Sequence, residues 1–427
     1  MTRPIVYDLT HLDIRSNLAA PTGIDRVDFA YARHFASADD HIAAAAYYGL
    51  NGLNIVSASA LGRVVDRASA RWGETTPCES DVSFLRTRDW ILGRAESTPE
   101  PGSIGQDVAK YASVVDRRLR ILSASLSGRT TPERALYLNV AQHRLEHGKH
   151  FEWLSARKDV RGVFFLHDLL PLDFPEYWPK GHEDRFARRV ETILRHASAL
   201  ITASRSVRER VQKERDNRGQ PPIPILSCPL PSAFERVDPG GDRDDELAKQ
   251  PYFVVVGTIE PRKNHLLLLN VWRRLVGNDA AAPKLVVIGS RGWENEQVID
   301  MFERCAALHD SVRETVHVSS AGLRRLIANS RALLMPSFAE GFGLPIIEAL
   351  GLGVPVIASD IPVFHEVSQE RAVFCDAIDG LGWLQAVEAM SDPGSSLSLS
   401  AREAARQFVV RDEAGYFSTV REFLSGL

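Results

Sequence analysis

The sequence predicts an α/β fold in two domains. Short apolar runs of strand length alternate with longer amphipathic stretches along most of the chain, which is the pattern of βαβ units on a parallel sheet. The chain has 427 residues, more than one hydrophobic core usually supports. The alternation also restarts after residues 236–250, a charged stretch with Pro and Gly that has the composition of a linker.

The elements follow from this pattern in chain order. In the first half we expect strands at 4–9, 41–49, 162–168 and 199–204, and amphipathic helices at 24–37, 181–197 and 206–217. In the second half we expect strands at 251–259, 284–290, 315–320, 332–337 and 355–359. The final segment, from about residue 401, is helical in pattern and too short to fold alone. The predicted units are therefore 1–235, 251–400 and a terminal helical segment at 401–427.

Composition and charge exclude several function classes. Hydrophobic residues make up 44% and charged residues 25%, as is ordinary for a globular protein. The net charge of -4 argues against nucleic acid as the main partner. The four cysteines are far apart, which suits a reducing cytosol. The start lacks the pattern of a signal peptide and no apolar run approaches the roughly 18 residues of a membrane span, so we expect a cytoplasmic location.

Residues 60–140 show sustained periodicity only at 107–126, which contain Arg117, Arg118 and Arg120. A basic amphipathic helix there would allow peripheral contact with the inner membrane surface. A solvated helix face is the favoured alternative.

The most informative stretch is SFAEGFGLPIIEALGLG, residues 337–353. Gly343 suits the cap and Pro345 suits the first helical position, so a helix should begin near Leu344. Glu348 then lies one turn inside that helix among apolar neighbours. An ionised carboxylate there costs several kcal/mol, on the order of other unpaired buried charges, unless it accepts hydrogen bonds. A pair of vicinal hydroxyls would supply them.

The turn before this helix adds groups that bind phosphate. The amides of Phe342, Gly343 and Leu344 lie at the predicted helix N-terminus, where free N–H groups and the helix dipole attract anions. Glu340 places a second carboxylate on the approach loop. Together these groups describe a site for a sugar nucleotide. The alternative is that Glu340 and Glu348 form only a cap and a buried salt bridge.

A second motif, GTIEPRKNH at residues 257–265, carries cations at the end of a strand. The glycine closes an apolar strand, the proline turns the chain, and Arg262, Lys263 and Asn264 are expected to open the next helix. Ligands of open α/β sheets bind at the carboxyl ends of strands. A cation pair there suits a diphosphate. The alternative is a solvated helix start, although the helix dipole disfavours cations at that end.

Polar groups also follow strands in the first half. Gly23 and Arg26 come after the first strand and predict an anion-binding loop that faces the other domain. His167 and Asp168 follow a strongly apolar strand, and either could have a structural role instead. Ser204 has the position of a helix cap.

We expect no metal and no other cofactor. The Asp-x-Asp pair Asp242 and Asp244 falls in the predicted linker and is interpreted as solvated. Arg262, Lys263 and a helix dipole can neutralise a diphosphate in place of a metal ion.

Taken together, GTIEPRKNH and PSFAEGFGLPIIEALGLGVPVIAS resemble the nucleotide-binding half of GT-B glycosyltransferases of the family 4 type. The segments PTGIDRV (21–27), GVFFLHDLLPL (162–172) and ITASRSVRE (201–209) resemble the first half of that family more loosely. The resemblance implies two Rossmann-like domains facing across a cleft, with the C-terminal helices returning to the N-terminal domain. It also implies transfer with retention of anomeric configuration.

The resemblance assigns roles to residues of this chain. It implies that Glu348 binds the donor ribose, that Glu340 addresses the donor sugar, and that His167 faces that sugar across the cleft. Where the family often has two glycines in its first loop, this chain has only Gly23. The expected catalytic residues are Arg262, Lys263, Glu340 and His167. The expected donor-binding residues are Gly23, Thr258, Arg262, Lys263, Glu340, Gly341, Phe342, Gly343, Leu344 and Glu348, and the acceptor-side candidates are Arg26 and Asp168.

The implied function is hexosyl or deoxyhexosyl transfer from a nucleotide sugar to a glycan or lipid-linked acceptor in bacterial surface polysaccharide synthesis. HDLLPLDFPEYW, residues 167–178, resembles mannosyltransferase-like members, which favours a GDP-sugar over a UDP-sugar. Two alternatives stay open. They are a sugar-nucleotide 2-epimerase of the same fold and a non-catalytic protein that binds nucleotide sugars.

Overall fold

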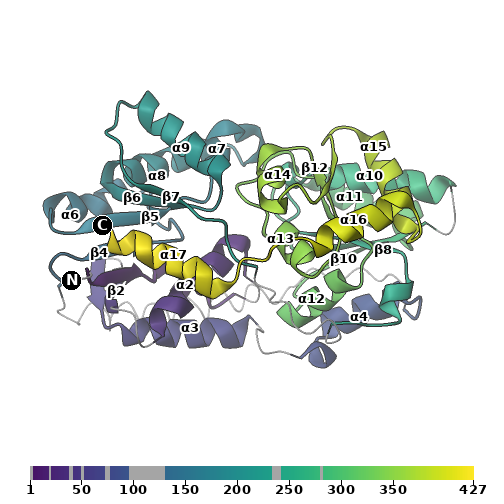
Figure 1. Ribbon diagram of the computed structural model, residues 1–427, viewed down its shortest axis with the longest axis horizontal. Coiled ribbons are helices and arrows are strands. Elements are labelled where there is room, and N and C mark those ends of the chain that lie inside the picture. The colour runs from purple at the N-terminus through teal and green to yellow at the C-terminus, as the bar shows by residue number, and fades with distance from the viewer. Residues whose placement is uncertain are drawn as a thin grey trace.

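A computed structural model describes residues 3–18, 21–37, 42–49, 52–72, 77–95, 130–232, 242–278 and 282–427. The chain folds into two lobes, each built around a sheet (Figure 1). The predicted basic helix at 107–126 and residues 236–241 of the predicted linker lie outside the described residues.

The first lobe contains a seven-stranded sheet in the order β3-β2-β1-β4-β5-β6-β7. Neighbouring strands are parallel, except that β3 runs antiparallel to β2. The strands are β1 (Ile5–Asp8), β2 (Ile42–Gly49), β3 (Gly52–Val56), β4 (Leu136–Asn139), β5 (Arg161–Phe165), β6 (Ala197–Thr202) and β7 (Ile225–Ser227). The helices of this lobe are α1 (Thr10–Arg15), α2 (Gly23–Ala36), α3 (Ser59–Arg71), α6 (Glu152–Ala156), α7 (Leu170–Asp173), α8 (His182–His196) and α9 (Arg205–Asn217). In Figure 1, α8 and α9 lie above this sheet and α2 lies below it.

The second lobe contains a six-stranded parallel sheet in the order β10-β9-β8-β11-β12-β13. Its strands are β8 (Tyr252–Val256), β9 (Lys284–Ile288), β10 (Val312–Thr315), β11 (Leu333–Met335), β12 (Val356–Ser359) and β13 (Val373–Cys375). Its helices are α10 (His265–Asn278), α11 (Glu296–Arg304), α12 (Ser320–Ala328), α13 (Leu344–Gly351), α14 (Pro362–Ser368), α15 (Gly380–Ser391) and α16 (Ser396–Arg406). The strand order reverses beside β8 and β11, where ligands of such sheets bind.

Most predicted strands lie within a few residues of the observed ones, but the strand expected at 315–320 is wrong. The strand is β10, and it ends at Thr315. His317 has φ 57°, a left-handed conformation that interrupts an extended chain. Ser319 then caps α12, its hydroxyl accepting a hydrogen bond from the Gly322 amide at 3.1 Å.

One segment of the N-terminal half packs on the second lobe, which corrects the domain boundary expected at 1–235. Helix α4 (Val82–Ile91) lies beside α12 and β10 (Figure 1). Asp81, the N-cap residue of α4, accepts a hydrogen bond from the Ser319 amide at 2.6 Å. The Thr87 hydroxyl donates to the Thr315 hydroxyl at 3.1 Å. The second lobe is therefore completed by a helix that precedes it by more than a hundred residues in the chain.

The C-terminal segment divides between the lobes. Helix α16 packs on α15 and α13 of the second lobe, whereas α17 (Glu413–Ser425) lies along α2 of the first (Figure 1). Tyr31 and Tyr416 share a buried hydroxyl–hydroxyl hydrogen bond of 2.7 Å, and His34 stacks on Phe417 with ring centroids 4.0 Å apart. The largest cluster of buried apolar side chains consequently runs through both lobes.

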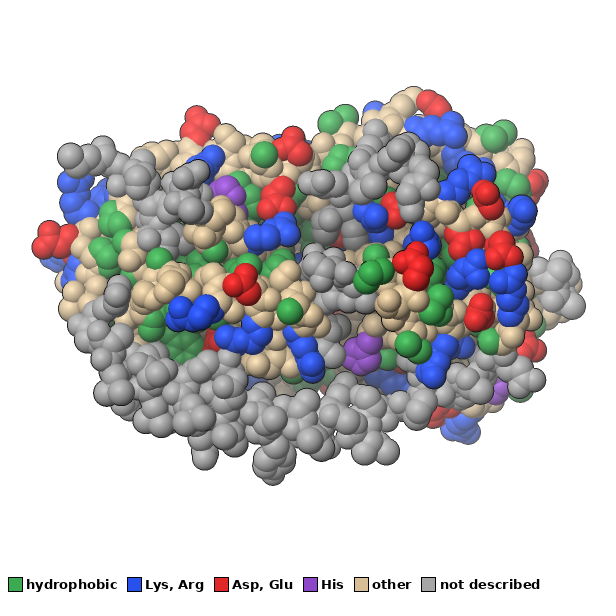
Figure 2. All heavy atoms as spheres, turned by 90° about the horizontal axis from the view of Figure 1, so that it is seen from below, with side chains coloured by type: hydrophobic (Ala, Val, Ile, Leu, Met, Phe, Trp, Pro, Cys, Tyr) green, Lys and Arg blue, Asp and Glu red, His purple; other side chains and the backbone are tan. Residues whose placement is uncertain are grey.

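The described surface is mixed in charge. On the face shown in Figure 2, Lys and Arg side chains are interspersed with Asp and Glu side chains over both lobes. This distribution matches the near balance of 51 basic and 55 acidic residues in the sequence. Within the described ranges, no helix is both long enough and apolar enough to cross a membrane.

Candidate nucleotide-sugar site

Two neighbouring strands of the second sheet bring the predicted motifs together. β8 and β11 are paired and parallel, so the loops that follow them leave the same edge. Arg262 and Lys263 lie in the 3-10 turn Pro261–Lys263, and Asn264 with φ 55° ends that turn before α10 begins. We expected Arg262, Lys263 and Asn264 to form the start of the helix, but α10 begins one turn later, at His265. The Asn264 side chain donates to the Pro336 carbonyl at 3.1 Å, which ties this turn to the loop after β11.

The cations of this turn are paired with carboxylates. Arg262 forms ion pairs with Glu260 at 2.6 Å and Glu340 at 2.5 Å, and Lys263 pairs with Glu340. The Ser337 hydroxyl donates to Glu340 at 2.9 Å. Burial alone would raise the pKa of Glu340, but Arg262 and Lys263 outweigh it and hold that pKa at about 2. An incoming diphosphate would have to compete with Glu340 for both cations.

Glu260 is a site residue that the sequence reasoning missed. Its side chain is almost completely buried, and burial raises its pKa even though Arg262 and Lys263 act in the opposite direction. The signal was present, because this carboxylate stands two residues before Arg262 in the quoted motif. A carboxylate next to a predicted cation pair is a candidate ion-pair partner for those cations.

Helix α13 begins where the sequence predicts. Gly343 has φ 104° at the N-cap, Leu344 is the first helical residue and Pro345 is the second. A side chain at Gly343 would be strained, and its Cβ would lie 3.0 Å from Phe364 Cε1. Phe342 is buried beside it. Packing therefore holds the turn in a geometry in which the first backbone amides of α13 have no hydrogen-bond partner inside the helix.

Glu348 is fully buried and its partner comes from the other lobe. Arg26 Nη1 donates to Glu348 Oε1 at 2.6 Å, whereas Glu348 Oε2 has no hydrogen-bond partner among the described residues. Burial raises the pKa of Glu348, and the Arg26 charge offsets part of that rise. Arg26, expected on the acceptor side, instead lies against the predicted ribose-binding carboxylate. The reason is that α2 points its first turn at α13.

The expected glycine loop of the first lobe is the start of α2. Thr22 is the N-cap and Gly23 is the first helical residue, and Thr22 and Asp25 form a capping box. A Cβ at Gly23 would lie 3.7 Å from Leu344 Cδ1. Gly23 therefore faces the start of α13 across the two lobes.

His167 and Asp168 lie against the Glu340 loop. A Cβ at Gly341 would lie 2.6 Å from the His167 carbonyl oxygen and 2.9 Å from Asp168 Cβ, so only glycine permits this approach. His167 Nε2 is 2.9 Å from the Val140 carbonyl oxygen, and burial lowers the pKa of His167 to about 4. His167 is therefore a neutral hydrogen-bonding group at neutral pH.

Asp168, expected on the acceptor side, lies near the donor motif instead. Burial raises its pKa, and the Arg262 charge partly offsets that rise. The Ser204 hydroxyl donates to the Gly341 carbonyl at 3.0 Å and also caps α9 through the Val207 amide. Ser204 thus has an interlobe contact in addition to the cap role that the sequence predicts.

Thr258 packs in the turn after β8, where a Cβ at Gly292 would lie 2.7 Å from Thr258 Cγ2. The structure therefore brings this predicted donor-binding residue to the edge that also carries Arg262 and Lys263.

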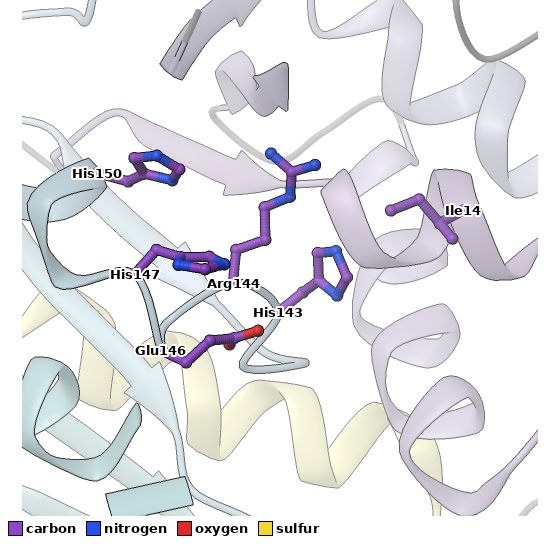
Figure 3. Close-up of a pocket in the computed structure, with 6 residues that line it drawn as sticks. All are labelled: Ile14, His143, Arg144, Glu146, His147 and His150. Atoms are coloured by element: carbon purple, nitrogen blue, oxygen red, sulfur yellow. The ribbon is translucent and has the colours of Figure 1, made fainter. Parts of the chain in front are cut away.

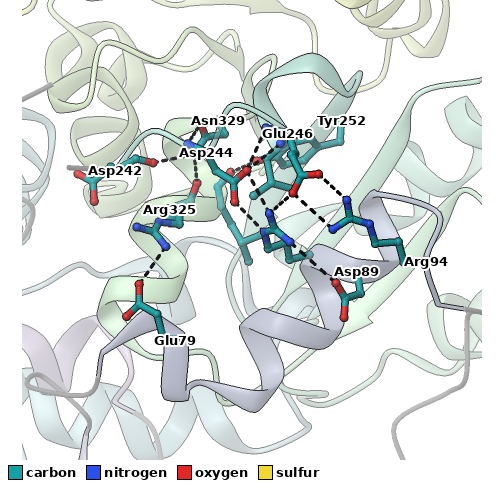
Figure 4. Close-up of polar contacts among 12 residues, drawn as sticks. Glu79, Asp89, Arg94, Asp242, Asp244, Glu246, Tyr252, Arg325 and Asn329 are labelled. Atoms are coloured by element: carbon teal, nitrogen blue, oxygen red, sulfur yellow. Dashed lines mark hydrogen bonds and ion pairs between the residues drawn. The ribbon is translucent and has the colours of Figure 1, made fainter. Parts of the chain in front are cut away.

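The Asp-x-Asp pair is ion-paired, which corrects the interpretation of solvated linker. Asp242 pairs with Arg324 at 2.8 Å and Asp244 with Arg88 of α4 at 2.7 Å. Glu246 extends the network to Arg88 and Arg94 (Figure 4). Among the described residues, no cluster of three His, Cys, Asp or Glu side chains has the geometry of a metal site.

Comparison with known proteins places this geometry in a family. Residues 242–379 match the family model described as glycosyl transferases group 1. The serotype-specific mannosyltransferase WbdA of Escherichia coli is 33% identical over 221 residues, covering 49% of this chain and 27% of WbdA. The O-antigen chain mannosyltransferase B of Escherichia coli is 30% identical over 237 residues, covering 55% of this chain and 61% of that protein. The chain thus spans only part of the length of these relatives.

Solved structures show the fold. Sucrose-phosphate synthase from Thermosynechococcus elongatus superposes with a TM-score of 0.59 at 15% identity, covering 99% of this chain and 98% of that one. Anabaena HepE in complex with UDP gives 0.57 at 14% identity, covering 100% of both chains. The chain has the GT-B fold, and its residues 242–379 match the family of group 1 glycosyl transferases.

Proposed function

We propose that this protein is a retaining glycosyltransferase that moves a hexose or deoxyhexose from a nucleotide sugar to a glycan or lipid-linked acceptor in surface polysaccharide synthesis. The observation that carries this proposal is the arrangement of Arg262, Lys263 and Glu340 on one sheet edge, with Glu348 one turn inside the next helix. The donor is proposed to be GDP-mannose or a related GDP-sugar, with a UDP-sugar second, because the proteins similar to this chain include O-antigen mannosyltransferases.

Each group has a proposed role toward the donor. Glu348 accepts hydrogen bonds from the two ribose hydroxyls, one of which supplies the donor that its Oε2 atom lacks. Arg262 and Lys263 neutralise the diphosphate, helped by the first amides of α13. Glu340, released from the cations, accepts hydrogen bonds from the sugar. His167 faces that sugar from the first lobe.

The proposed reaction needs no enzymatic base. The acceptor hydroxyl oxygen bonds to the anomeric carbon on the face that the diphosphate leaves, and the bond from that carbon to the diphosphate oxygen breaks. The hydroxyl proton passes to the leaving diphosphate oxygen. The protein supplies position and charge, because Arg262 and Lys263 stand where negative charge develops. Closure of the lobes around the donor would limit hydrolysis.

We further propose that transfer is independent of a metal ion and takes place in the cytoplasm. The cation pair and the helix dipole supply the positive charge that a metal would otherwise bring. The four cysteines form no disulfide bond with one another, and a reducing cytoplasm favours this state.

The proposal is tested by incubating the protein with a panel of GDP- and UDP-sugars, each with and without oligosaccharide acceptors, and with a chelator in parallel. A nucleotide at about 100 times its dissociation constant stabilises a protein by about 2.7 kcal/mol, so thermal shift ranks the donors first. Product that depends on the acceptor supports a transferase. Conversion of the sugar nucleotide without acceptor identifies the epimerase alternative, and binding without turnover identifies the non-catalytic one. Activity lost in chelator and restored by manganese would contradict metal independence.

A further inference from the structure

A cavity of about 480 Å³ opens on the first lobe, away from the donor motifs. The loop after β4 provides most of its lining, namely His143, Arg144, Glu146, His147 and His150, and Ile14 of α1 faces them (Figure 3). Three imidazoles, a guanidinium and a carboxylate therefore stand within eight residues of one another in the sequence. The sequence analysis did not assign this loop a function.

The cavity lies at the edge of the first sheet from which the loop that carries His167 also leaves. β4 is flanked by the parallel strands β1 and β5, and the loops after these strands leave the sheet together. The His143 ring is 5.7 Å from that of His11, and His11 Nε2 is 2.7 Å from Asp25 Oδ1. Asp25 immediately precedes Arg26, which contacts Glu348. A short series of side chains thus leads from the cavity to the contact between Arg26 and Glu348.

Two imidazoles of this cavity, those of His143 and His150, have a lowered pKa. Burial lowers the pKa of His143 to about 3, with the nearby His11 charge acting in the same direction. Burial also lowers the pKa of His150. A neutral imidazole has one N–H donor and one acceptor nitrogen. A sugar hydroxyl can both accept and donate, so the two groups are complementary.

The cavity also holds polar atoms that lack a close hydrogen-bond partner among the described residues. Burial acts to raise the pKa of Glu146, but its backbone hydrogen bond and Arg189 outweigh that effect, so it is ionised at neutral pH. Arg189 lies 3.5 Å from Glu146 Oε2, at the limit of a hydrogen bond, and no better donor is present for that atom in the described structure. His150 Nδ1 likewise has no partner there. A buried carboxylate oxygen and a buried ring nitrogen without partners favour a ligand with hydroxyl groups, which can both donate and accept hydrogen bonds.

We infer that this cavity is a subsite for a neutral hexose unit of the glycan acceptor, one or more sugars away from the bond that forms. A phosphate or other anion fits less well, because Glu146 would repel it and offset the attraction of the Arg144 guanidinium that also lines the cavity. The identification of the glycan as the acceptor rests on the proposed function, whereas the binding of a neutral sugar rests on the cavity itself. A subsite of this kind would make the enzyme prefer acceptors that are long enough to reach it.

The experiment titrates the protein with α-linked mannobiose and mannotetraose, without any donor, by isothermal titration calorimetry or ligand-observed NMR. Glu146→Gln removes the carboxylate, and Glu152→Gln is the matched control. Glu152 also pairs with an arginine of α8, Arg195 at 3.2 Å, but outside the cavity lining. Loss of a hydrogen bond to a charged group is expected to weaken mannotetraose binding by about tenfold or more in Glu146→Gln and not in the control.

A second variant distinguishes a loss of sugar binding from a loss of folding. The His150 ring is stacked near Tyr48, with centroids 6.1 Å apart and 15° between planes, so His150→Phe keeps an aromatic ring there and removes both nitrogens. It should weaken mannotetraose binding while the melting temperature stays near that of the parent. Unchanged oligosaccharide binding in both variants overturns the inference. Inorganic phosphate that binds and displaces mannotetraose also overturns it, in favour of an anion site.

Failure of the proposed function gives a different result. If no nucleotide sugar serves as donor but mannotetraose binds and depends on Glu146, the sugar subsite stands and the transferase proposal falls. If transfer occurs and Glu146→Gln leaves the Michaelis constants of short and long acceptors unchanged, the transferase stands and the subsite falls.

Discussion

Arg26 of the first lobe donates to Glu348 of the second with 2.6 Å between Arg26 Nη1 and Glu348 Oε1. The Glu348 side chain is 1% exposed and that of Arg26 25%. The contact therefore occupies the carboxylate that we propose for the donor ribose, and it does so from the other lobe. Donor binding requires Arg26 to share or leave that carboxylate.

Replacing Arg26 should separate folding from binding. Arg26→Gln should lower the melting temperature of the empty protein, because a buried carboxylate loses its charged partner at a cost of about 1–3 kcal/mol. Nucleotide diphosphate should then raise the melting temperature by more in the variant than in the parent, since the ribose restores hydrogen bonds to Glu348. Arg33→Gln, which removes an exposed ion pair from the same helix, is the control. A smaller ligand-induced rise in Arg26→Gln would show that Arg26 itself binds the nucleotide.

Lys263 should matter more for turnover than for binding. The leaving diphosphate gains charge in the transition state, so Lys263→Ala should lower kcat by about 10- to 100-fold and change KM less. Arg262→Ala should act in the same direction, but it also leaves Glu260 without its partner. Steady-state kinetics with a saturating acceptor measure the effect, and Arg273→Ala on the exposed side of α10 is the control. A raised KM at constant kcat would refute the electrostatic role.

Much of the fold and part of the site were predictable from sequence, because their signals are local. The apolar runs before Gly257 and Ser337 predict buried strands, and Gly343 with Pro345 predicts the start of α13. The pairing of parallel strands then brings their carboxyl ends together, so the Arg262 and Glu340 loops had to meet.

The features that the sequence did not predict are contacts between distant segments. Residues 82–91 show no sustained periodicity in the sequence, so neither helix α4 nor its packing on the second lobe was predicted. The partner of Arg26 could not be predicted from the sequence, because folding can bring many different carboxylates within reach of a cation that follows the first strand. The histidines of the β4 loop carry no family motif that the sequence analysis recognised, and only the fold gathers them around one cavity.

The contact of α4 with the second lobe should depend on Asp81. Its carboxylate caps α4 through the Phe84 amide at 3.0 Å and accepts from the Ser319 amide at 2.6 Å. Asp81→Ala removes both bonds and should cost about 1–3 kcal/mol. Hydrogen–deuterium exchange over residues 78–94 should then become faster, whereas Asp89→Ala, at an exposed position of the same helix, should leave it unchanged. Equal protection in both variants would mean that apolar packing alone holds α4.

The buried hydrogen bond between Tyr31 and Tyr416 should couple the stability of the first lobe to that of helix α17. Tyr416→Phe leaves the Tyr31 hydroxyl without its partner in a site from which water is excluded, which should cost about 1–3 kcal/mol of unfolding free energy. The double variant Tyr31→Phe with Tyr416→Phe should be less destabilised than the sum of the single changes, because no hydroxyl is then left unpaired. Denaturant unfolding of the four proteins measures the coupling. Additive effects would contradict it.

The central claim is that Glu348 and Glu340 address different parts of one nucleotide-sugar donor. Calorimetric titration with GDP and UDP, with melting curves of the empty proteins, tests it most directly. Glu348→Gln should weaken binding of the favoured nucleotide by about one to two decades. Glu340→Gln should not weaken it, because that carboxylate competes with the diphosphate for Arg262 and Lys263. If both variants bind nucleotide as the parent does and differ only in a lower melting temperature, the two carboxylates are structural and the account is contradicted.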